Sequence, residues 1–416
     1  MKKNLVILIL FLIPILATAQ ETLTLEKCYE LAHKNYPLAK QSALIGQKSV
    51  LEIESANKAK LPKIDFNAQA TYQSEVIGLP IAIPGMEPIN KDQYRATLDI
   101  NQNIYNGGTI DANARLKQVQ SKTQQQQVEV NLYQLKSRIN QFYFSILLLQ
   151  EKRELLLSKN ELLSAKIKEV KTGVKYGAIL PASELILEAE MLKITQQLTE
   201  IKFEKKTMFE NLSQLTYTEI DAETKLVVPE SSAITSENKR PELTFFDLQS
   251  QQLDMSKELI SKSQLPRLNA FGQAGYGNPG LNMLDNSFQP FYVVGLKANW
   301  NIFDWGKNKK DLSALDISEE MILSEKESFV LNNSMELNHI KNESDKIQEL
   351  LLSDQKIIET REKILQSANA QMKNGVITTS EYLTEVTNLF EAKNTLKLHE
   401  VQLSLSKSNY KIISGN

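Results

Sequence analysis

The sequence predicts an α+β membrane protein in which a half-molecule of about 200 residues occurs twice. Three observations carry this prediction. Similar motifs recur about 200 residues apart, each copy contains two segments that alternate apolar and polar residues, and a stretch of more than 60 residues without proline follows each pair. We therefore expect one β-hairpin and one long helical hairpin from each half.

The composition excludes several classes of protein. Hydrophobic residues make up 42% of the 416 residues, enough to bury a core, and the formal net charge of −2 leaves no basic excess for a nucleic-acid partner. The single cysteine, Cys28, and three scattered histidines predict no disulfide, no metal site and no cofactor. No nucleophile is paired with a base in a recognisable pattern, so we do not expect an enzyme.

The first residues have the pattern of an export signal. Lys2 and Lys3 precede a twelve-residue apolar run that only Pro14 interrupts, and Ala17-Thr18-Ala19 is an A-x-A cleavage motif. This predicts a signal peptide over residues 1–19 and an exported mature chain, with an uncleaved anchor helix as the alternative. The residue directly after the cleavage motif is Gln20 and not a cysteine, so lipid acylation is not expected there.

The internal repeat fixes the expected domains. Leu61-Pro62 recurs as Leu265-Pro266, 204 residues later, and Asn106-Gly107-Gly108 corresponds to Asp304-Trp305-Gly306, 198 residues later. Differences in loop length explain the drift in spacing. We expect a first repeat over residues 20–220, a connector over 221–240 and a second repeat over 241–416.

Each repeat is expected to follow the same order of elements. A helix over residues 38–60 stops before Pro62, and barrel hairpins follow at about 63–106 and 267–304. Long helical hairpins then occupy 109–215 and 307–413, each turning at a glycine, Gly177 or Gly375. At about 1.5 Å per residue, the first helix of each hairpin would be about 100 Å long. Pro181 opens one return helix, and Thr378-x-x-Glu381 is a capping box that opens the other.

The alternating strands have the properties of outer-membrane strands. Eleven steps of about 3.3 Å, tilted by about 40°, span roughly 28 Å, close to the apolar band of about 25 Å in outer-membrane barrels. Aromatic residues bracket two strands, Tyr94 with Tyr105 and Tyr292 with Phe303. We therefore expect Leu98 and Leu296 to face lipid, and Asp99 and Lys297 to face the lumen.

Four strands cannot close a barrel, and an open sheet in lipid would leave unsatisfied edges. Several chains must therefore pool their strands, giving eight strands from a dimer or twelve from a trimer. Polar inner faces favour the larger barrel, which can hold a water-filled channel.

The chain resembles the TolC-like outer-membrane efflux protein family in motifs that span both halves. These are Leu23-Thr24-Leu25-Glu26-x-x-Tyr29-x-x-Ala32-x-x-x-Asn35-Tyr36-Pro37, Leu61-Pro62 before a strand, Leu98-x-x-x-Gln102-x-Ile104-Tyr105-Asn106-Gly107-Gly108 after one, and the turn at Gly177. The resemblance implies a homotrimer with a 12-stranded outer-membrane barrel on a periplasmic helical barrel. It also implies docking to a periplasmic adaptor (membrane fusion) protein and an inner-membrane transporter of RND or ABC type.

The resemblance also assigns roles at the hairpin turns. The family often carries an aspartate about six residues after the turn glycine, at a closed entrance. Glu381 stands at that distance here, and Glu184 one residue further, so both are gate candidates; first-turn acids that favour the helix dipole are the alternative. The adaptor-docking candidates are Tyr176, Gly177, Ala178, Asn374, Gly375 and Val376. Pro181 departs from the plainer family turn.

The functions that remain open are a passive conduit for small molecules such as drugs or metals, a channel for type I protein secretion, and a structural or adhesive trimeric coiled-coil stalk. The doubled β-hairpins argue against a stalk, which needs only one anchor. Gly275-x-Gly277-x-x-Gly280 resembles a dinucleotide motif, but Pro279 and the loop that follows provide no helix to receive a phosphate. A glycine-rich hairpin tip explains it better.

Overall fold

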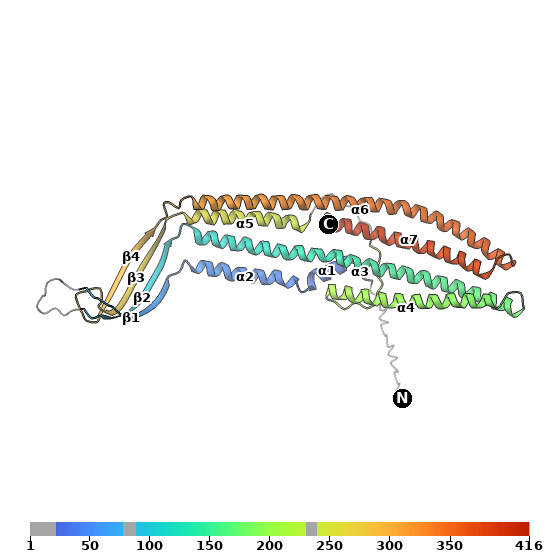
Figure 1. The fold of residues 1–416 in the computed structure, drawn as a ribbon, viewed down its shortest axis with the longest axis horizontal. Coiled ribbons are helices and arrows are strands. Elements are labelled where there is room, and N and C mark those ends of the chain that lie inside the picture. The colour runs from blue at the N-terminus through green and yellow to red at the C-terminus, as the bar shows by residue number, and fades with distance from the viewer. Residues whose placement is uncertain (1–21, 78–88, 230–238, 416) are drawn as a thin grey trace, which may run out of the picture. The chain divides into compact units, whose positions relative to one another are not determined.

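The computed structural model describes residues 22–77, 89–229 and 239–415 (Figure 1). The predicted signal peptide lies outside these residues, as does part of the predicted connector. The described elements are α1 (Leu25–Asn35), α2 (Ala39–Lys58), β1 (Lys63–Tyr72), β2 (Asp92–Tyr105), α3 (Thr109–Lys175), α4 (Ala182–Thr216), α5 (Pro241–Ser263), β3 (Arg267–Asn278), β4 (Gln289–Asn299), α6 (Lys307–Lys373) and α7 (Thr379–Ser414).

The chain divides into two compact units, and each draws on both sequence repeats. One unit, here the strand unit, consists of Pro37–Asn131 and Arg240–Asn332; the other, the hairpin unit, consists of Met1–Tyr36, Leu132–Lys239 and Asn333–Asn416. The long helices α3 and α6 contribute to both units. The halves of the repeat are therefore interleaved in the folded chain.

The four strands form one antiparallel sheet in the order β1-β2-β3-β4. Phe66 pairs with Leu98 between β1 and β2, and Leu98 pairs with Ala274 between β2 and β3, so one strand of each repeat meets at the centre. The two expected hairpins are thus confirmed, and they join side by side. Strands β1 and β4 are the two edges of this sheet (Figure 1).

Strand β4 is shorter than the sequence predicted. It ends at Asn299, whereas alternation suggested a strand through residue 304, so the expectation that Phe303 brackets the strand was wrong. Asn299 pairs with Arg267, the first residue of β3. Pro266 precedes Arg267 and has no backbone N–H to donate, so the ladder cannot continue on that side.

Four helices of the strand unit follow the order of the strands to which they connect. The Gln125 side chain of α3 donates to the Ser42 carbonyl of α2 at 3.0 Å. On the other side of α3, Arg115 pairs with Glu258 of α5 at 2.6 Å. Lys257 of α5 in turn binds two acids of α6, Asp316 at 2.8 Å and Glu319 at 2.6 Å. The order α2-α3-α5-α6 thus matches β1-β2-β3-β4, and polar contacts link each neighbouring pair.

The two strand-to-helix turns use the left-handed region of φ in both repeats. Gly107 and Gly108 have φ of 70° and 82°, and Trp305 and Gly306 have φ of 59° and 78°. A Cβ on Gly107 would lie 2.8 Å from the Leu265 Cβ, so that turn has room only for glycine. Trp305, at the sheet edge, is instead 89% exposed. Neighbouring structure therefore explains why one repeat has glycine and the other tolerates tryptophan.

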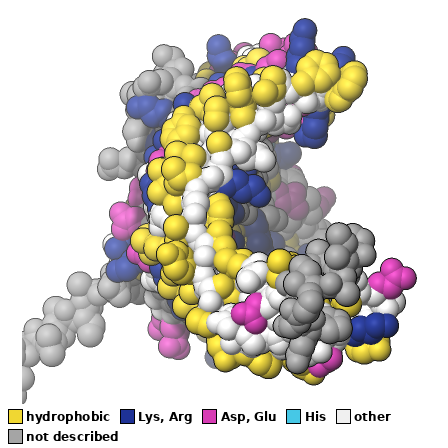
Figure 2. Space-filling model, turned by 90° about the vertical axis from the view of Figure 1, so that its left-hand side faces the viewer, with side chains coloured by type: hydrophobic (Ala, Val, Ile, Leu, Met, Phe, Trp, Pro, Cys, Tyr) yellow, Lys and Arg dark blue, Asp and Glu magenta, His cyan; other side chains and the backbone are white. Residues whose placement is uncertain are grey.

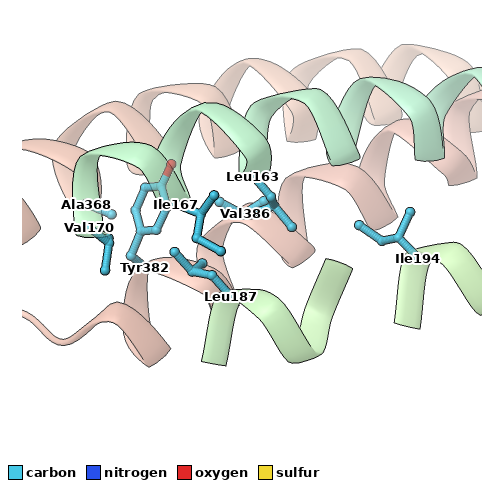
Figure 3. Close-up of a cluster of buried hydrophobic side chains, with 8 residues drawn as sticks. All are labelled: Leu163, Ile167, Val170, Leu187, Ile194, Ala368, Tyr382 and Val386. Carbon is cyan, nitrogen blue, oxygen red and sulfur yellow. The ribbon is translucent and has the colours of Figure 1, made fainter. Parts of the chain in front are cut away.

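A hydrophobic core in the hairpin unit joins all four of its long helical segments. Figure 3 shows the buried side chains Leu163, Ile167, Val170, Leu187, Ile194, Ala368, Tyr382 and Val386, which come from α3, α4, α6 and α7. Leu163, Val170 and Leu187 are fully buried. Spacings of three, four and seven residues along α3 place its members on one face, as expected for packed long helices.

Helix α1, which the sequence analysis did not anticipate, explains the opening motif. Thr24 caps the helix by accepting from the Lys27 backbone N–H at 3.3 Å. Tyr29 hydrogen-bonds to Asn140, whose amide donates to Asn409 at 2.7 Å. Burial raises the pKa of the Cys28 thiol to about 12, so this cysteine is a packing residue.

Candidate functional site

The sheet has one polar and one apolar face, divided as the alternation predicted. Antiparallel partners lie on the same face, and the register joins Asp99 to Gln273 and Asn269 to Lys297. Asp99 and Lys297 therefore share the polar face. Leu98 and Leu296, one residue earlier in each strand, share the other face.

Asp99 is the centre of a hydrogen-bond network on the polar face. Its carboxylate accepts from Gln273 Nε2 at 2.5 Å, Asn67 Nδ2 at 2.6 Å and Thr97 Oγ1 at 2.9 Å. These donors come from all three of the strands β1, β2 and β3. The network links both repeats and holds a negative charge with neutral donors.

The apolar face carries large side chains with nothing packed over them. Leu296 is 70% exposed and Val294 is 74% exposed, as are similar side chains of β1 such as Phe66. In Figure 2 hydrophobic side chains form a row along the white band that faces the viewer, which consists of backbone and other side chains. Exposed apolar surface of this extent marks a region that another apolar phase or protein covers.

Two phenylalanines lie flat on the polar face because glycines leave room beneath them, a feature that the alternation alone did not reveal. A Cβ on Gly275 would lie 2.5 Å from the Phe291 ring, and a Cβ on Gly295 would lie 2.8 Å from the Phe271 ring. The Arg95 guanidinium lies 5.4 Å from the Phe291 centroid. Such aromatic–glycine pairs stabilise twisted sheets and keep bulk close to the backbone.

The helical hairpins turn with the same hydrogen bonds in both repeats. The Ala178 N–H donates to the Gly173 carbonyl at 2.8 Å, and the Val376 N–H donates to the Gln371 carbonyl at 2.9 Å. Gly177 and Gly375 have φ of 71° and 69°, which completes a Schellman motif at each turn. The turns are therefore equivalent at their first half, as the repeat predicted.

The docking candidates at the turns are exposed. Tyr176 is 77% exposed and Val376 is 70% exposed, with Leu180 similarly open on the first turn. No atom lies within 4 Å of a Cβ built on Gly177 or Gly375. The turns thus present apolar side chains on an uncovered backbone.

The two gate candidates have different surroundings. Glu381 forms the predicted capping box with Thr378: its carboxylate accepts from the Thr378 backbone N–H at 2.8 Å, and the Thr378 hydroxyl accepts from the Glu381 backbone N–H at 3.2 Å. The same hydroxyl also donates to the carboxylate at 2.9 Å. The bonds to the carboxylate, the backbone bond above all, lower the pKa of Glu381. Glu184 instead lies 3.3 Å from Lys171, which also binds Glu188 at 3.1 Å. Those bonds raise the pKa of Lys171. The candidates therefore carry unlike partners, and the return helix at Pro181 has no side-chain cap.

Two buried lysines of α3 near the turns escaped the sequence analysis. Lys159 binds Glu190 at 2.7 Å and Thr387 at 3.3 Å, and Lys166 binds Asn369 at 2.6 Å. Both lysines are only 7% exposed. Their spacing of seven residues, in phase with the core positions of α3, is the signal that could have revealed them.

The described residues contain no group of His, Cys, Asp and Glu side chains that could hold a metal. Within the same residues, every helix is too short or too polar to cross a membrane. The chemical features that remain are an amphipathic sheet with open edges and exposed helical turns. An amphipathic sheet is suited to line a conducting passage, and exposed turns are suited to dock another protein.

Comparison with known proteins finds a matching protein family. Residues 29–185 match the sequence model of the outer membrane efflux protein family. The match covers less than half of the chain and lies in its first repeat. The members of that family are passive channels, not enzymes. No curated protein matches the chain at a significant level.

Solved structures share the fold of this chain at low sequence identity. A structure of CusC, described in terms of folding and transmembrane channel formation, has a TM-score of 0.73 at 13% identity and covers 94% of this chain and 92% of its own. The outer membrane protein VceC of Vibrio cholerae has a TM-score of 0.68 at 14% identity, covering 94% and 96%. The CmeC outer membrane channel of Campylobacter jejuni has a TM-score of 0.67 at 17% identity, covering 94% and 85%.

Proposed function

We propose that this protein is the passive outer-membrane conduit of a tripartite export system for small molecules. Three chains would pool their strands into a 12-stranded barrel, with the helical hairpins in the periplasm. The hairpin turns would dock a periplasmic adaptor that links the channel to a proton-driven (RND) or ATP-driven (ABC) inner-membrane transporter. The observation that carries this proposal is the sheet: it has an uncovered apolar face, a polar face and two unpaired edges.

The open edges support assembly between chains. An unpaired edge in hydrocarbon leaves backbone N–H and C=O groups without partners, at several kcal/mol each. Pairing β4 of one chain with β1 of the next satisfies both edges at once and continues the antiparallel order. The polar faces of the strands would then enclose water, and the apolar faces would meet lipid.

The repeat indicates which residues meet at that junction. Within one chain, Gly107 at the end of β2 lies against Leu265 at the start of β3. Trp305 is the counterpart of Gly107, and Leu61 is the counterpart of Leu265. Trp305 of one chain should therefore approach Leu61 of the next. Both side chains are exposed in the single chain.

A cysteine pair tests this assembly. Leu61→Cys with Trp305→Cys should form a disulfide between chains, and the covalent ladder should stop at three subunits. The pair cannot close within one chain, because its strands are separated by about 14 Å of sheet, against about 7 Å for a disulfide. Each single variant is the control, since the native Cys28 is buried. A ladder that ends at two, or that continues past three, would refute the trimer.

Planar-bilayer recordings test conduction directly. Purified protein should produce discrete ion-conducting steps, whereas a stalk would insert without conducting. The proposed gate at Glu184 and Glu381 predicts that divalent cations reduce the current from the periplasmic side. Protein that inserts as a trimer but carries no current under any applied potential or ionic condition would refute the conduit.

A further inference from the structure

The polar face of the sheet carries more positive than negative charge. Residues at odd positions of the four strands share this face through the register. The charged residues among them are Lys63, Asp65, Arg95, Asp99, Arg267 and Lys297. Four cations therefore face two carboxylates, an excess of two positive charges in each chain.

Both carboxylates already have partners. Asp65 lies 3.0 Å from the Lys63 ammonium, and Asp99 accepts from three neutral donors. Within the part of the chain that the structure describes, neither Arg267 nor Lys297 has a carboxylate partner. These two side chains carry uncompensated charge on the polar face.

Arg267 and Lys297 are close neighbours at the end of the sheet where the strands join the helices. Arg267 pairs with Asn299, and Lys297 pairs with Asn269, so the two cations occupy adjacent rows of β3 and β4. A hollow of about 640 Å³ on this face is lined by both cations, by the amides of Asn101, Asn269 and Asn299, and by the Asp99 carboxylate with its donor Gln273. Amide N–H groups and cations are all donors to an anion.

The position of these cations excludes the simplest alternative. Lysine and arginine near a membrane surface often extend toward lipid headgroups while their stems cover apolar surface. Here the side chains leave the sheet on the face opposite to Leu296 and Val294, the face that lipid would cover. They therefore face the enclosed side of any barrel that these strands form.

We infer that this end of the lumen selects for anions, and that the exported substrates are small organic anions. The inference rests on the proposed conduit, because a ring of three chains brings three copies of each cation around one passage. A passage whose lining carries a net positive charge between low-dielectric walls concentrates anions. The carboxylate or sulfonate of a substrate would exchange water for the Arg267 guanidinium and neighbouring amides.

Reversal potentials of reconstituted channels in a KCl gradient test this inference, with chloride as the anion probe. At about 0.1 M salt, where the Debye length is about 10 Å, chloride should permeate about twofold or more better than potassium. At about 1 M, where that length is about 3 Å, the preference should disappear. Arg267→Gln with Lys297→Gln should bring the permeability ratio close to one, and Arg267→Glu with Lys297→Glu should invert it.

The control variant keeps both positive charges and changes the shapes of the two side chains. Arg267→Lys with Lys297→Arg should retain the chloride preference, which separates charge from a structural effect. If Arg267→Gln with Lys297→Gln does not assemble, Lys297→Gln alone should move the permeability ratio part of the way toward one. The salt dependence of the wild-type ratio tests the inference without any variant. Channels that conduct without chloride preference, or amide variants that select as the wild type does, would overturn the inference and leave the conduit standing. Absence of any conductance would instead refute the conduit.

Discussion

Two adjacent valines at the middle of β4 test the assignment of the sheet's faces. Val293 lies on the polar face, opposite Gln273, and Val294 lies on the apolar face, opposite Gly272. Replacing either valine by arginine makes the same chemical change one residue apart on the same strand. Only the medium that surrounds the new side chain differs.

The structure sets the expected size of the effect. Val294 is 74% exposed in the single chain, so lipid is the medium that would surround most of its side chain. Arginine on the lipid face near the bilayer midplane costs about 2–4 kcal/mol in barrels, which lowers the folding equilibrium constant by about 30-fold to 1,000-fold for each chain. Val293→Arg places its charge in water, so we expect a much smaller loss.

Urea titration of protein refolded into lipid vesicles measures both changes, with protease-resistant trimer as the readout. Val294→Arg should lower the urea midpoint strongly, whereas Val293→Arg should assemble and conduct. Equal losses for both variants, or a larger loss for Val293→Arg, would refute the assigned faces.

Three further predictions concern the hairpin unit. Glu190→Ala removes the main partner of the buried Lys159 and should cost about 3–5 kcal/mol by thermal melting of the helices, whereas replacing both residues by leucine should cost less. Glu184→Ala with Glu381→Ala should weaken divalent-cation block in bilayer recordings without affecting trimer formation, and unchanged block would remove both acids from the gate. Hydrogen bonds from Thr378 hold the pKa of Glu381 below its ordinary value. The stability that these bonds provide is therefore complete when the pH is above the ordinary pKa, and it is lost as the pH falls through the lowered pKa. Acidification below about pH 4 should therefore lower the melting temperature of the wild type more than that of Glu381→Gln; parallel curves would contradict this.

The alternation of apolar and polar residues and the turn residues were enough to predict most of the fold. The period-two pattern placed Leu98 and Asp99 on opposite faces, and the register confirms that Asp99 and Lys297 share a face. Glycine at the hairpin turns and the Thr378-x-x-Glu381 motif were sufficient to predict the turns and the start of the last helix, because both depend on local backbone geometry. Local signals of this kind need no knowledge of distant contacts.

Features that depend on distant partners escaped the sequence analysis. The alternation continued past Asn299, but β4 ends there because its neighbour begins after Pro266, and a strand ends where its partner ends. The buried Lys159 looked like any helical lysine, since Glu190 and Thr387 come from two other helices. Helix α1, by contrast, had a local signal that the sequence analysis did not use: its buried residues Leu25, Cys28 and Ala32 have helical spacing, and Thr24 caps it.

The two return helices begin differently, and this difference affects how many adaptor chains a trimer could bind. One begins with a capping box and the other, after Pro181, begins without a side-chain cap. A ring of three chains would thus present six turns of two alternating kinds, three with a fixed first turn and three with a first turn that unwinds more easily. An adaptor that recognises one kind would bind in three copies, and one that tolerates both would bind in six. Counting the adaptor chains bound to each trimer would show whether adaptors treat the ring as threefold, with three copies, or as nearly sixfold, with six.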